Sequence, residues 1–207
     1  MNKTFEKTVV TGVSLYSCIN GKVNTWEGKE TGYILNLGLD KVEAEKVRKV
    51  ASELIENAKK DTDFTSTNGQ KVNPKSWLPT DFLVNKLIKE REGKSYITCK
   101  ARHEFKRKDG TTSRVYIPIF DKNAQRVEDE ENFELAGNAK INVELGFNVV
   151  HSPIYQGVSV RIRSIQMVDD NGRFIRGEGS TVGNMFKPVE GTKNEETTKK
   201  ETEQVPF

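Results

Sequence analysis

The chain has 207 residues, of which 34% are hydrophobic and 30% are charged, so it is polar yet long enough to bury one sizeable core. It contains no run of about 18 apolar residues and no apolar segment among its first residues, so we expect a cytosolic protein without a membrane-spanning helix. The net charge of +3 predicts no partner by itself, but seven basic residues and only two acidic ones lie between Lys94 and Tyr116.

The first part of the chain predicts two strands. Alternation predicts a strand from Lys7 to Ile19, and its apolar face is expected to hold Val9, Val13, Leu15 and Ile19. A turn at Asn20-Gly21-Lys22 and a polar stretch carrying Trp26 follow. The second predicted strand has alternating apolar residues at Tyr33, Leu35 and Leu37.

Two helices are predicted next. Asp40 and Glu43 form a D-x-x-E capping box, and helical spacing of apolar residues then predicts a helix from about Lys41 to Lys60. Residues 61–79 are expected to be irregular, and a short helix is expected from Thr80 or Asp81 to Gly93. Trp77 either packs over this short helix, which we favour, or serves as a stacking platform.

Residues Lys94 to Phe120 predict a long β-hairpin with one apolar face and one basic, aromatic face. The apolar face is expected to hold Ile97, Cys99, Ala101, Phe105, Val115, Ile117 and Ile119. A two-residue loop at Asp109-Gly110 would place these apolar positions beside charged ones, so that register is excluded. A three-residue loop, Lys108-Asp109-Gly110 with Gly110 left-handed, aligns the two apolar sets and pairs Glu104 with Arg114.

The opposite face of this hairpin combines cations with aromatic rings. Its members, with neighbouring cations of the hairpin, are Tyr96, Lys100, Arg102, Lys106, Arg107, Arg114, Tyr116 and Phe120. Such a surface suits single-stranded nucleic acid, because phosphates attract cations and unpaired bases stack on rings. The alternative is a solvated edge hairpin whose lysines and arginines only maintain solubility, and the hairpin alone leaves both interpretations open.

Two further strands are predicted near the end of the domain. Apolar residues alternate from Ala139 to Val149, and a second alternating run begins at Val158. The polar face of this second run carries Arg161 and Arg163, which join the candidate nucleic-acid-binding cations. The apolar phase then shifts, which predicts a β-bulge near Ser164 of the kind that helps a sheet to curl into a barrel.

Several chemistries find no support in the sequence. The acidic stretch Glu128 to Glu134 offers four adjacent acids that cannot all point at one ion, so we expect a solvated loop rather than a metal site. The histidines His103 and His151 are isolated, and His103 is expected to end a core face. The sequence lacks a phosphate-binding P-loop and zinc-ligand spacing, so we expect no catalytic site, no metal and no cofactor. Cys18 and Cys99 are expected to be buried thiols.

The carboxyl-terminal residues differ in composition from the rest. No apolar residue occurs from Gly191 to Gln204, so this segment cannot bury enough surface to offset its ordering entropy and is expected to be disordered. It ends in Val205, Pro206 and Phe207, a ring beside a terminal carboxylate, which suits a pocket on a partner protein. We therefore predict a domain over residues 1–187 and a flexible tail over residues 188–207.

The chain resembles the single-stranded-DNA-binding proteins of tailed bacteriophages. The resemblance rests on the strand order around the helix at 40–60, on the block from Gly137 to Asp170, and on the V-P-F terminus, which is similar also to the I-P-F ending of bacterial single-stranded-DNA-binding proteins. It implies a mainly β fold with α insertions, namely an OB-fold-like closed or partly open barrel with one long helix, one short helix and a disordered tail.

The resemblance also implies a function. Family members coat single-stranded DNA during phage replication, recombination and repair in the bacterial cytoplasm, are not enzymes, and recruit replication proteins such as DNA polymerase or helicase through the tail. Both monomers and homodimers occur among them. In this chain, the cations given above would neutralise phosphates, and Tyr96, Tyr116, Phe120 and Trp26 would stack on bases. The alternative is a β-barrel protein-interaction or virion accessory protein without nucleic-acid binding, and a nucleic-acid enzyme is the least supported option.

Overall fold

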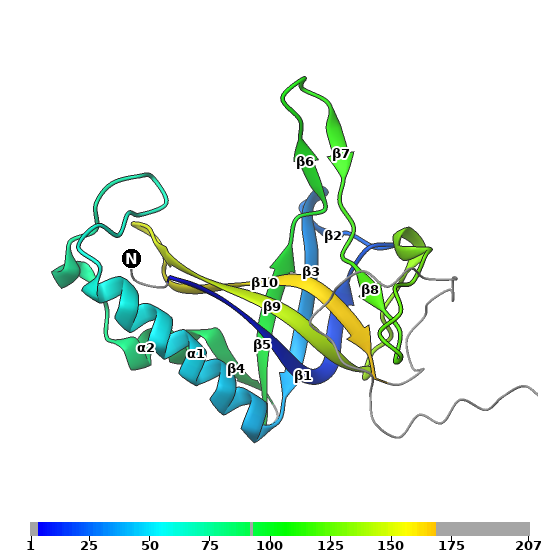
Figure 1. The fold of residues 1–207 in the computed structure, drawn as a ribbon, viewed down its shortest axis with the longest axis horizontal. Coiled ribbons are helices and arrows are strands. Elements are labelled where there is room, and N and C mark those ends of the chain that lie inside the picture. Colours follow the sequence, from blue (N-terminus) through cyan, green and yellow to red (C-terminus); the bar gives the residue numbers. More distant parts are fainter. Residues whose placement is uncertain (1–3, 92, 169–207) are drawn as a thin grey trace, which may run out of the picture.

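A computed structural model describes residues 4–91 and 93–168 (Figure 1). The two α-helices are α1 (Lys41–Lys60) and α2 (Thr80–Leu87), and short 3-10 helices lie at Pro74–Ser76 and Glu130–Asn132. The strands are β1 (Phe5–Cys18), β2 (Asn24–Trp26), β3 (Lys29–Leu39), β4 (Ile88–Arg91), β5 (Lys94–Ala101), β6 (Glu104–Lys106), β7 (Thr112–Arg114), β8 (Ile119–Phe120), β9 (Lys140–His151) and β10 (Gln156–Met167).

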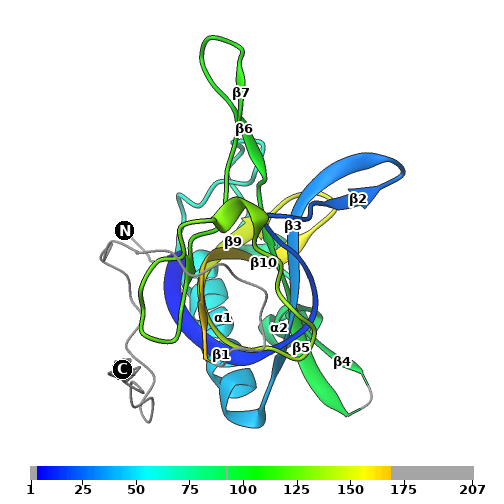
Figure 2. The same cartoon turned by 90° about the vertical axis from the view of Figure 1, so that its right-hand side faces the viewer.

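Five of the strands close into a barrel, which Figure 2 views along its axis. β1 pairs with β3 and β9, β9 pairs with β10, and β3 pairs with β5, all antiparallel. β10 and β5 complete the ring by a parallel pairing at Arg161 and Lys100. A five-stranded Greek-key barrel of this kind is the OB-fold, so the predicted fold class is confirmed.

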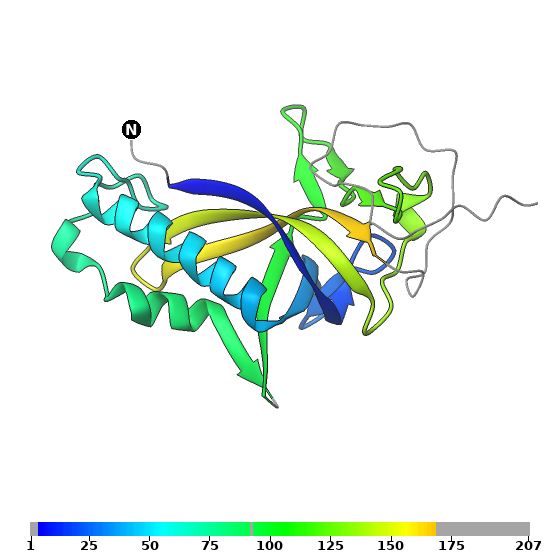
Figure 3. The same cartoon turned by 60° about the horizontal axis from the view of Figure 1, so that its bottom comes forward.

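Helix α1 has the predicted bounds and packs one face against the barrel (Figure 3). Its first turn is capped because the carboxylate of Asp40 accepts a hydrogen bond of 2.8 Å from the backbone N–H of Glu43. The buried face of α1 consists of Ala44, Val47, Ala51, Leu54, Ile55 and Ala58. These side chains join the same core as the inward residues of the barrel strands, so one hydrophobic core holds helix and barrel together.

The inward face of β1 is not the predicted one. Apart from Cys18 at its end, the buried positions of β1 are Val10, Gly12 and Ser14. Leu15 is 40% exposed, and Val9 and Val13 are only half-buried. The reason is that β1 and β3 cross closely, so that a Cβ atom on Gly12 would lie 2.4 Å from the carbonyl oxygen of Gly38. Gly12 and Ser14 therefore face inward where the two strands cross, and Val13 and Leu15 lie on the outer face.

The short helix α2 ends earlier than expected. Leu87 is its last residue, and the chain continues as β4, which pairs with β5 through a turn at Gly93, where φ is +73°. The free edge of β5 supplies hydrogen-bond partners to Ile88–Arg91, so these residues extend instead of continuing the helix. Trp77 is packed, as favoured, but against Phe64 and His151, with ring centroids 5.5 and 4.7 Å away.

The predicted long hairpin is broken into separate parts. The predicted register holds at its tip, because β6 pairs with β7 at Glu104 and Arg114 and Gly110 has φ of +85°. The strand pairing does not continue to β5 or to β8, however, since β5 pairs with β3 and β4, while β8 pairs with β10. Phe105 is consequently 47% exposed rather than in the core, and Phe120 is buried at 3% exposure rather than on a basic face.

Other predictions have mixed outcomes. The bulge near Ser164 is confirmed, because the register of β9 and β10 shifts between Ile162 and Ser164. The acidic loop is not entirely solvated: Glu130 is buried and binds the Arg126 guanidinium at 2.8 and 2.9 Å.

Both cysteines are buried and free, and burial raises the pKa of the Cys99 thiol. No helix within the described ranges is long and apolar enough to cross a membrane.

The close crossing of β1 and β3 makes a testable prediction. Replacing Gly12 with alanine places a methyl group 2.4 Å from the Gly38 carbonyl and 2.8 Å from Leu37 Cδ1, so we expect the free energy of unfolding to fall by about 1 to 3 kcal/mol in urea denaturation. Gly137→Ala is the control, because nothing lies within 4 Å of its added methyl group. Equal stability of the two variants would contradict this account of β1.

Candidate nucleic-acid interface

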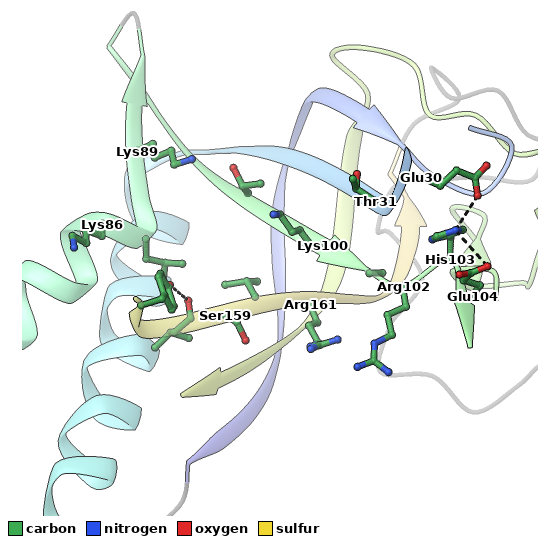
Figure 4. Close-up of a pocket in the computed structure, with 16 residues that line it drawn as sticks. Glu30, Thr31, Lys86, Lys89, Lys100, Arg102, His103, Glu104, Ser159 and Arg161 are labelled. Atoms are coloured by element: carbon green, nitrogen blue, oxygen red, sulfur yellow. Dashed lines mark hydrogen bonds and ion pairs between the residues drawn. The ribbon is translucent and has the colours of Figure 1, made fainter. Parts of the chain in front are cut away.

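A groove with a volume of about 690 Å³ lies over the junction of β5 and β10 (Figure 4). Its floor comes from the two barrel strands, and its ends come from α2 and β4 on one side and from the start of β3 and the segment before β6 on the other. Five exposed cations line it, namely Lys86, Lys89, Lys100, Arg102 and Arg161. The groove therefore gathers positive charge from four separate parts of the chain.

The strand register places the central cations. Side chains alternate along β5, so Thr98 and Lys100 point outward while Ile97 and Cys99 enter the core. Lys100 lies directly beside Arg161 in the parallel pairing, and Figure 4 shows Arg102 and Arg161 extending in the same direction. Like charges side by side on a sheet repel each other, so this arrangement favours the binding of an anion between them.

The groove cations are not neutralised by nearby acids. Within residues 4–91 and 93–168, none of the five forms an ion pair, and Lys86 instead lies 4.4 Å from the centroid of the Phe82 ring. Because these positive charges are exposed and have no acidic partners, the groove has the electrostatic character of a site for phosphate groups.

An aromatic ring lines the α2 end of the groove. Tyr155 belongs to the turn between β9 and β10, and its hydroxyl donates a hydrogen bond of 3.1 Å to the carbonyl of Val158. Burial raises the pKa of this phenol. Gly157 has φ of +145°, and a Cβ atom there would lie 3.1 Å from the Tyr155 hydroxyl, so glycine provides both the backbone conformation and the space for the ring.

The opposite end of the groove carries two carboxylates around a histidine. His103 is buried, as predicted, and its Nε2 lies 2.9 Å from Glu30 Oε2 and 3.9 Å from Glu104 Oε2. The His103 ring also meets the edge of the Tyr33 ring, with centroids 6.3 Å apart. These contacts fix the segment between β5 and β6 against the start of β3, so the end of the groove has a defined shape.

The structure brings only some of the predicted site residues together. Lys100, Arg102 and Arg161 share the groove. Tyr96 lies on the same face of β5, farther from the β5–β10 junction, by strand alternation. Trp26 is 70% exposed at the end of β2, in the hairpin between β2 and β3. Lys106, Arg107 and Arg114 lie on or beside the separate β6–β7 hairpin, where neighbouring Tyr33 raises the pKa of Arg114.

Three predicted residues lie elsewhere, which corrects the prediction of one shared face. Phe120 is in the core beside β10, and Tyr116 is half-buried in the segment that joins β7 to β8. Arg163 does not line the groove, and its Nε lies 3.9 Å from Glu144 Oε1. The tail residues Val205, Pro206 and Phe207 are outside the described residues.

Three residues of the groove that could contact nucleic acid are not among the predicted site residues, namely Lys86, Lys89 and Tyr155. Lys86 and Lys89 fall within the short helix expected from Thr80 or Asp81 to Gly93. Only the pairing of β4 with β5 reveals that the two lysines reach the groove. Tyr155 had one usable signal, because the loop between the last two strands of an OB-fold takes part in oligonucleotide binding.

Metal chemistry has no visible site in this region. Among the residues that the structure describes, no group of three or more His, Cys, Asp or Glu side chains is placed to hold a metal ion.

No protein-family model and no curated protein sequence matches the chain. Among solved structures, it is similar to gp2.5, a single-stranded-DNA-binding protein encoded by bacteriophage T7, with 14% identity, a TM-score of 0.52, and coverage of 82% of this chain and 93% of that chain. The single-stranded-DNA-binding protein of bacteriophage Enc34 has 17% identity and a TM-score of 0.47, over 84% of this chain and 87% of that chain. The T7 comparison shows the fold that the sequence resemblance implied.

A buried asparagine fixes the chain where it returns from the β6–β7 hairpin to the barrel. Asn20 Nδ2 donates to the carbonyl of Ile117, and Asn20 Oδ1 accepts from the N–H of Ile117, both at 2.8 Å. Asn20 has φ of +49°, a left-handed conformation that asparagine tolerates. Two backbone groups of a residue outside any strand are satisfied in this way.

The variant Asn20→Gly tests how much these two hydrogen bonds stabilise the protein, since glycine keeps the left-handed backbone and removes only the side chain. Loss of both hydrogen bonds leaves two buried backbone groups unpaired, so we expect the free energy of unfolding to fall by about 2 to 4 kcal/mol in denaturant titration. Asn20→Asp retains the acceptor for the Ile117 N–H but places a buried carboxylate oxygen against the Ile117 carbonyl, so at neutral pH it should lose at least as much stability. An unchanged free energy of unfolding in Asn20→Gly would contradict this role of Asn20 and show that water replaces its two hydrogen bonds to Ile117.

Proposed function

We propose that this protein binds single-stranded DNA without strict sequence preference, along the groove over β5 and β10. The observation that carries the proposal is the convergence of Lys86, Lys89, Lys100, Arg102 and Arg161 on one groove without acidic partners. Phosphates of a DNA backbone supply the missing negative charge. Such contacts do not depend on base identity, so the protein coats DNA rather than reading its sequence.

The barrel topology supports the same location. In OB-folds, the face of the second and third strands and the loops after the first and fourth strands bind oligonucleotides. Here the second and third barrel strands are β3 and β5, the first loop includes the hairpin with Trp26, and the fourth loop holds Tyr155. T7 gp2.5, which shares the fold, is a single-stranded-DNA-binding protein.

Aromatic rings near the groove would supply the second part of the binding energy. Tyr155 lines the groove, Tyr96 lies farther along the same face of β5, and Trp26 stands at the hairpin of the first loop. Stacking of an unpaired base on such a ring contributes about 1 to 3 kcal/mol. The paired bases of a duplex are not available for this contact, so we expect single strands to bind more tightly than duplexes.

The biological role that we propose follows the phage proteins that the sequence resembles. The protein would protect single strands during phage DNA replication, recombination and repair in the cytoplasm of the bacterial host, acting as a binding protein and not as an enzyme. Its tail would recruit DNA polymerase or helicase through Phe207. The terminal Val205-Pro206-Phe207 sequence and the polar composition of the preceding residues support this proposal.

A salt-dependent titration tests the groove. With (dT) oligonucleotides and tryptophan or tyrosine fluorescence, five neutralised phosphates predict a slope of log K against log salt of about −3.5, since each contributes about −0.7 on a single strand. Arg161→Gln should weaken binding and reduce the slope by about 0.7. Lys49→Gln, an exposed cation on α1, is the matched control and should change neither.

A flat titration at low salt would contradict DNA binding and favour the protein-interaction alternative. Equal effects of Arg161→Gln and Lys49→Gln would instead place the DNA elsewhere on the protein. An excess of unlabelled duplex should compete poorly with the labelled single strand.

Phe207→Ala tests the tail separately. We expect it to abolish capture of the phage or host DNA polymerase or helicase by the immobilised protein, while the affinity for (dT) oligonucleotides stays within twofold of the original. A chain ending at Pro188 should behave in the same way. Capture that persists in both variants would show that the tail does not recruit these partners.

A further inference from the structure

The hairpin of β6 and β7 projects from the barrel, as Figures 1 and 2 show from two directions. We define the arm as residues 103–115, because the N–H of Val115 donates to the carbonyl of His103 at 2.8 Å and extends the ladder to this pair. Among the described residues, β6 and β7 pair in a sheet only with each other. The base of the arm is fixed by the His103–Glu30 contact, and the rest extends into solvent.

The arm exposes a phenylalanine. Phe105 is 47% exposed, because a two-stranded ribbon has no second layer that could bury its side chain. The arm also exposes the cations Lys106, Arg107, Lys108 and Arg114, of which Arg107 shares the face of Phe105 by strand alternation. Of the two acids in the arm, Asp109 is held in the turn by hydrogen bonds from the N–H and hydroxyl of Thr111, at 2.9 and 2.6 Å. An exposed ring among cations is the combination that unpaired bases and phosphates require.

The arm begins at the edge of the groove, because its first two residues, His103 and Glu104, both line the groove. Side chains alternate along a strand, so His103, Phe105 and Arg107 share one face of the arm. His103 lines the groove and contacts Glu30 there. A DNA strand that leaves the groove past Arg102 and His103 therefore meets the arm, where Phe105, on the His103 side, offers an exposed ring.

We propose that the arm is a second DNA-contact zone, in which Phe105 stacks on a base of the strand that leaves the groove and Arg107 binds an adjacent phosphate. This inference rests on the proposed function and adds a residue to it. The groove alone binds a short strand. A longer strand engages the groove and the arm together, so the arm increases the length of DNA that each protein covers.

Oligonucleotides of two lengths distinguish binding to the groove from binding to the arm. We choose (dT) strands of about 5 and about 15 nucleotides, within the range of site sizes known for OB-folds. Phe105→Ala should leave the dissociation constant for the short strand within twofold and raise that for the long strand about tenfold, as expected for one lost stacking contact. Thr112→Ala is the matched control, because Thr112 is exposed on the opposite face of the same arm, where it pairs with Lys106, and it should change neither constant. Phe105→Tyr should restore binding of the long strand.

The outcomes distinguish the arm from the groove. Failure of the unaltered protein to bind either strand would refute the proposed function itself. Normal binding of the long strand by Phe105→Ala would overturn the arm contact and leave the groove intact. Equal weakening for both lengths would place Phe105 within the groove and overturn a separate zone. The contact can also be observed directly: in Phe105→Trp, we expect the long oligonucleotide to quench the fluorescence of the added tryptophan and the short one to leave it unchanged.

Discussion

The candidate site depends on how the barrel closes. The antiparallel pairings bring β3, β1, β9 and β10 around the core, and β10 then meets β5 in parallel at Arg161 and Lys100. The inward neighbours of these two residues, such as Cys99, Val160 and Ile162, are buried, so the cations have no route into the core and must face outward. The pairing of β5 with β10 that closes the barrel therefore also places these two cations side by side on its surface.

The elements outside the barrel complete the site, although they take no part in closing the barrel. α2 and β4 bring Lys86 and Lys89 to one end of the groove, and the contact of His103 with Glu30 shapes the other end. Asn20 holds the returning chain through two hydrogen bonds to Ile117. The barrel therefore carries surface segments that shape its groove, and loops on the barrel take part in oligonucleotide binding in OB-folds in general.

Local patterns in the sequence predicted what depends on local physics. The bounds of α1 follow from Asp40 and helical spacing, the turn at Gly110 follows from the alignment of apolar positions, and the bulge near Ser164 follows from a shift in phase. The choice of strand partners was not predictable in this way. The segment at 94–120 alternates like one hairpin, but β5 gains more from pairing with β3 and β4, and Phe120 gains more from burial beside β10. The wrong partner choice placed Phe105 in the core and left Lys86 and Lys89 out of the site.

The central claim is that a single DNA strand lies over the junction of β5 and β10. The most direct measurement is photocrosslinking of the full-length protein to a (dT) oligonucleotide carrying photoreactive thymine analogues, followed by mass spectrometry of the crosslinked peptides. The account predicts crosslinks in peptides from 94–102 and 155–163, with few in α1, and their loss at high salt. Crosslinks concentrated on α1, or spread evenly over the protein, would contradict it.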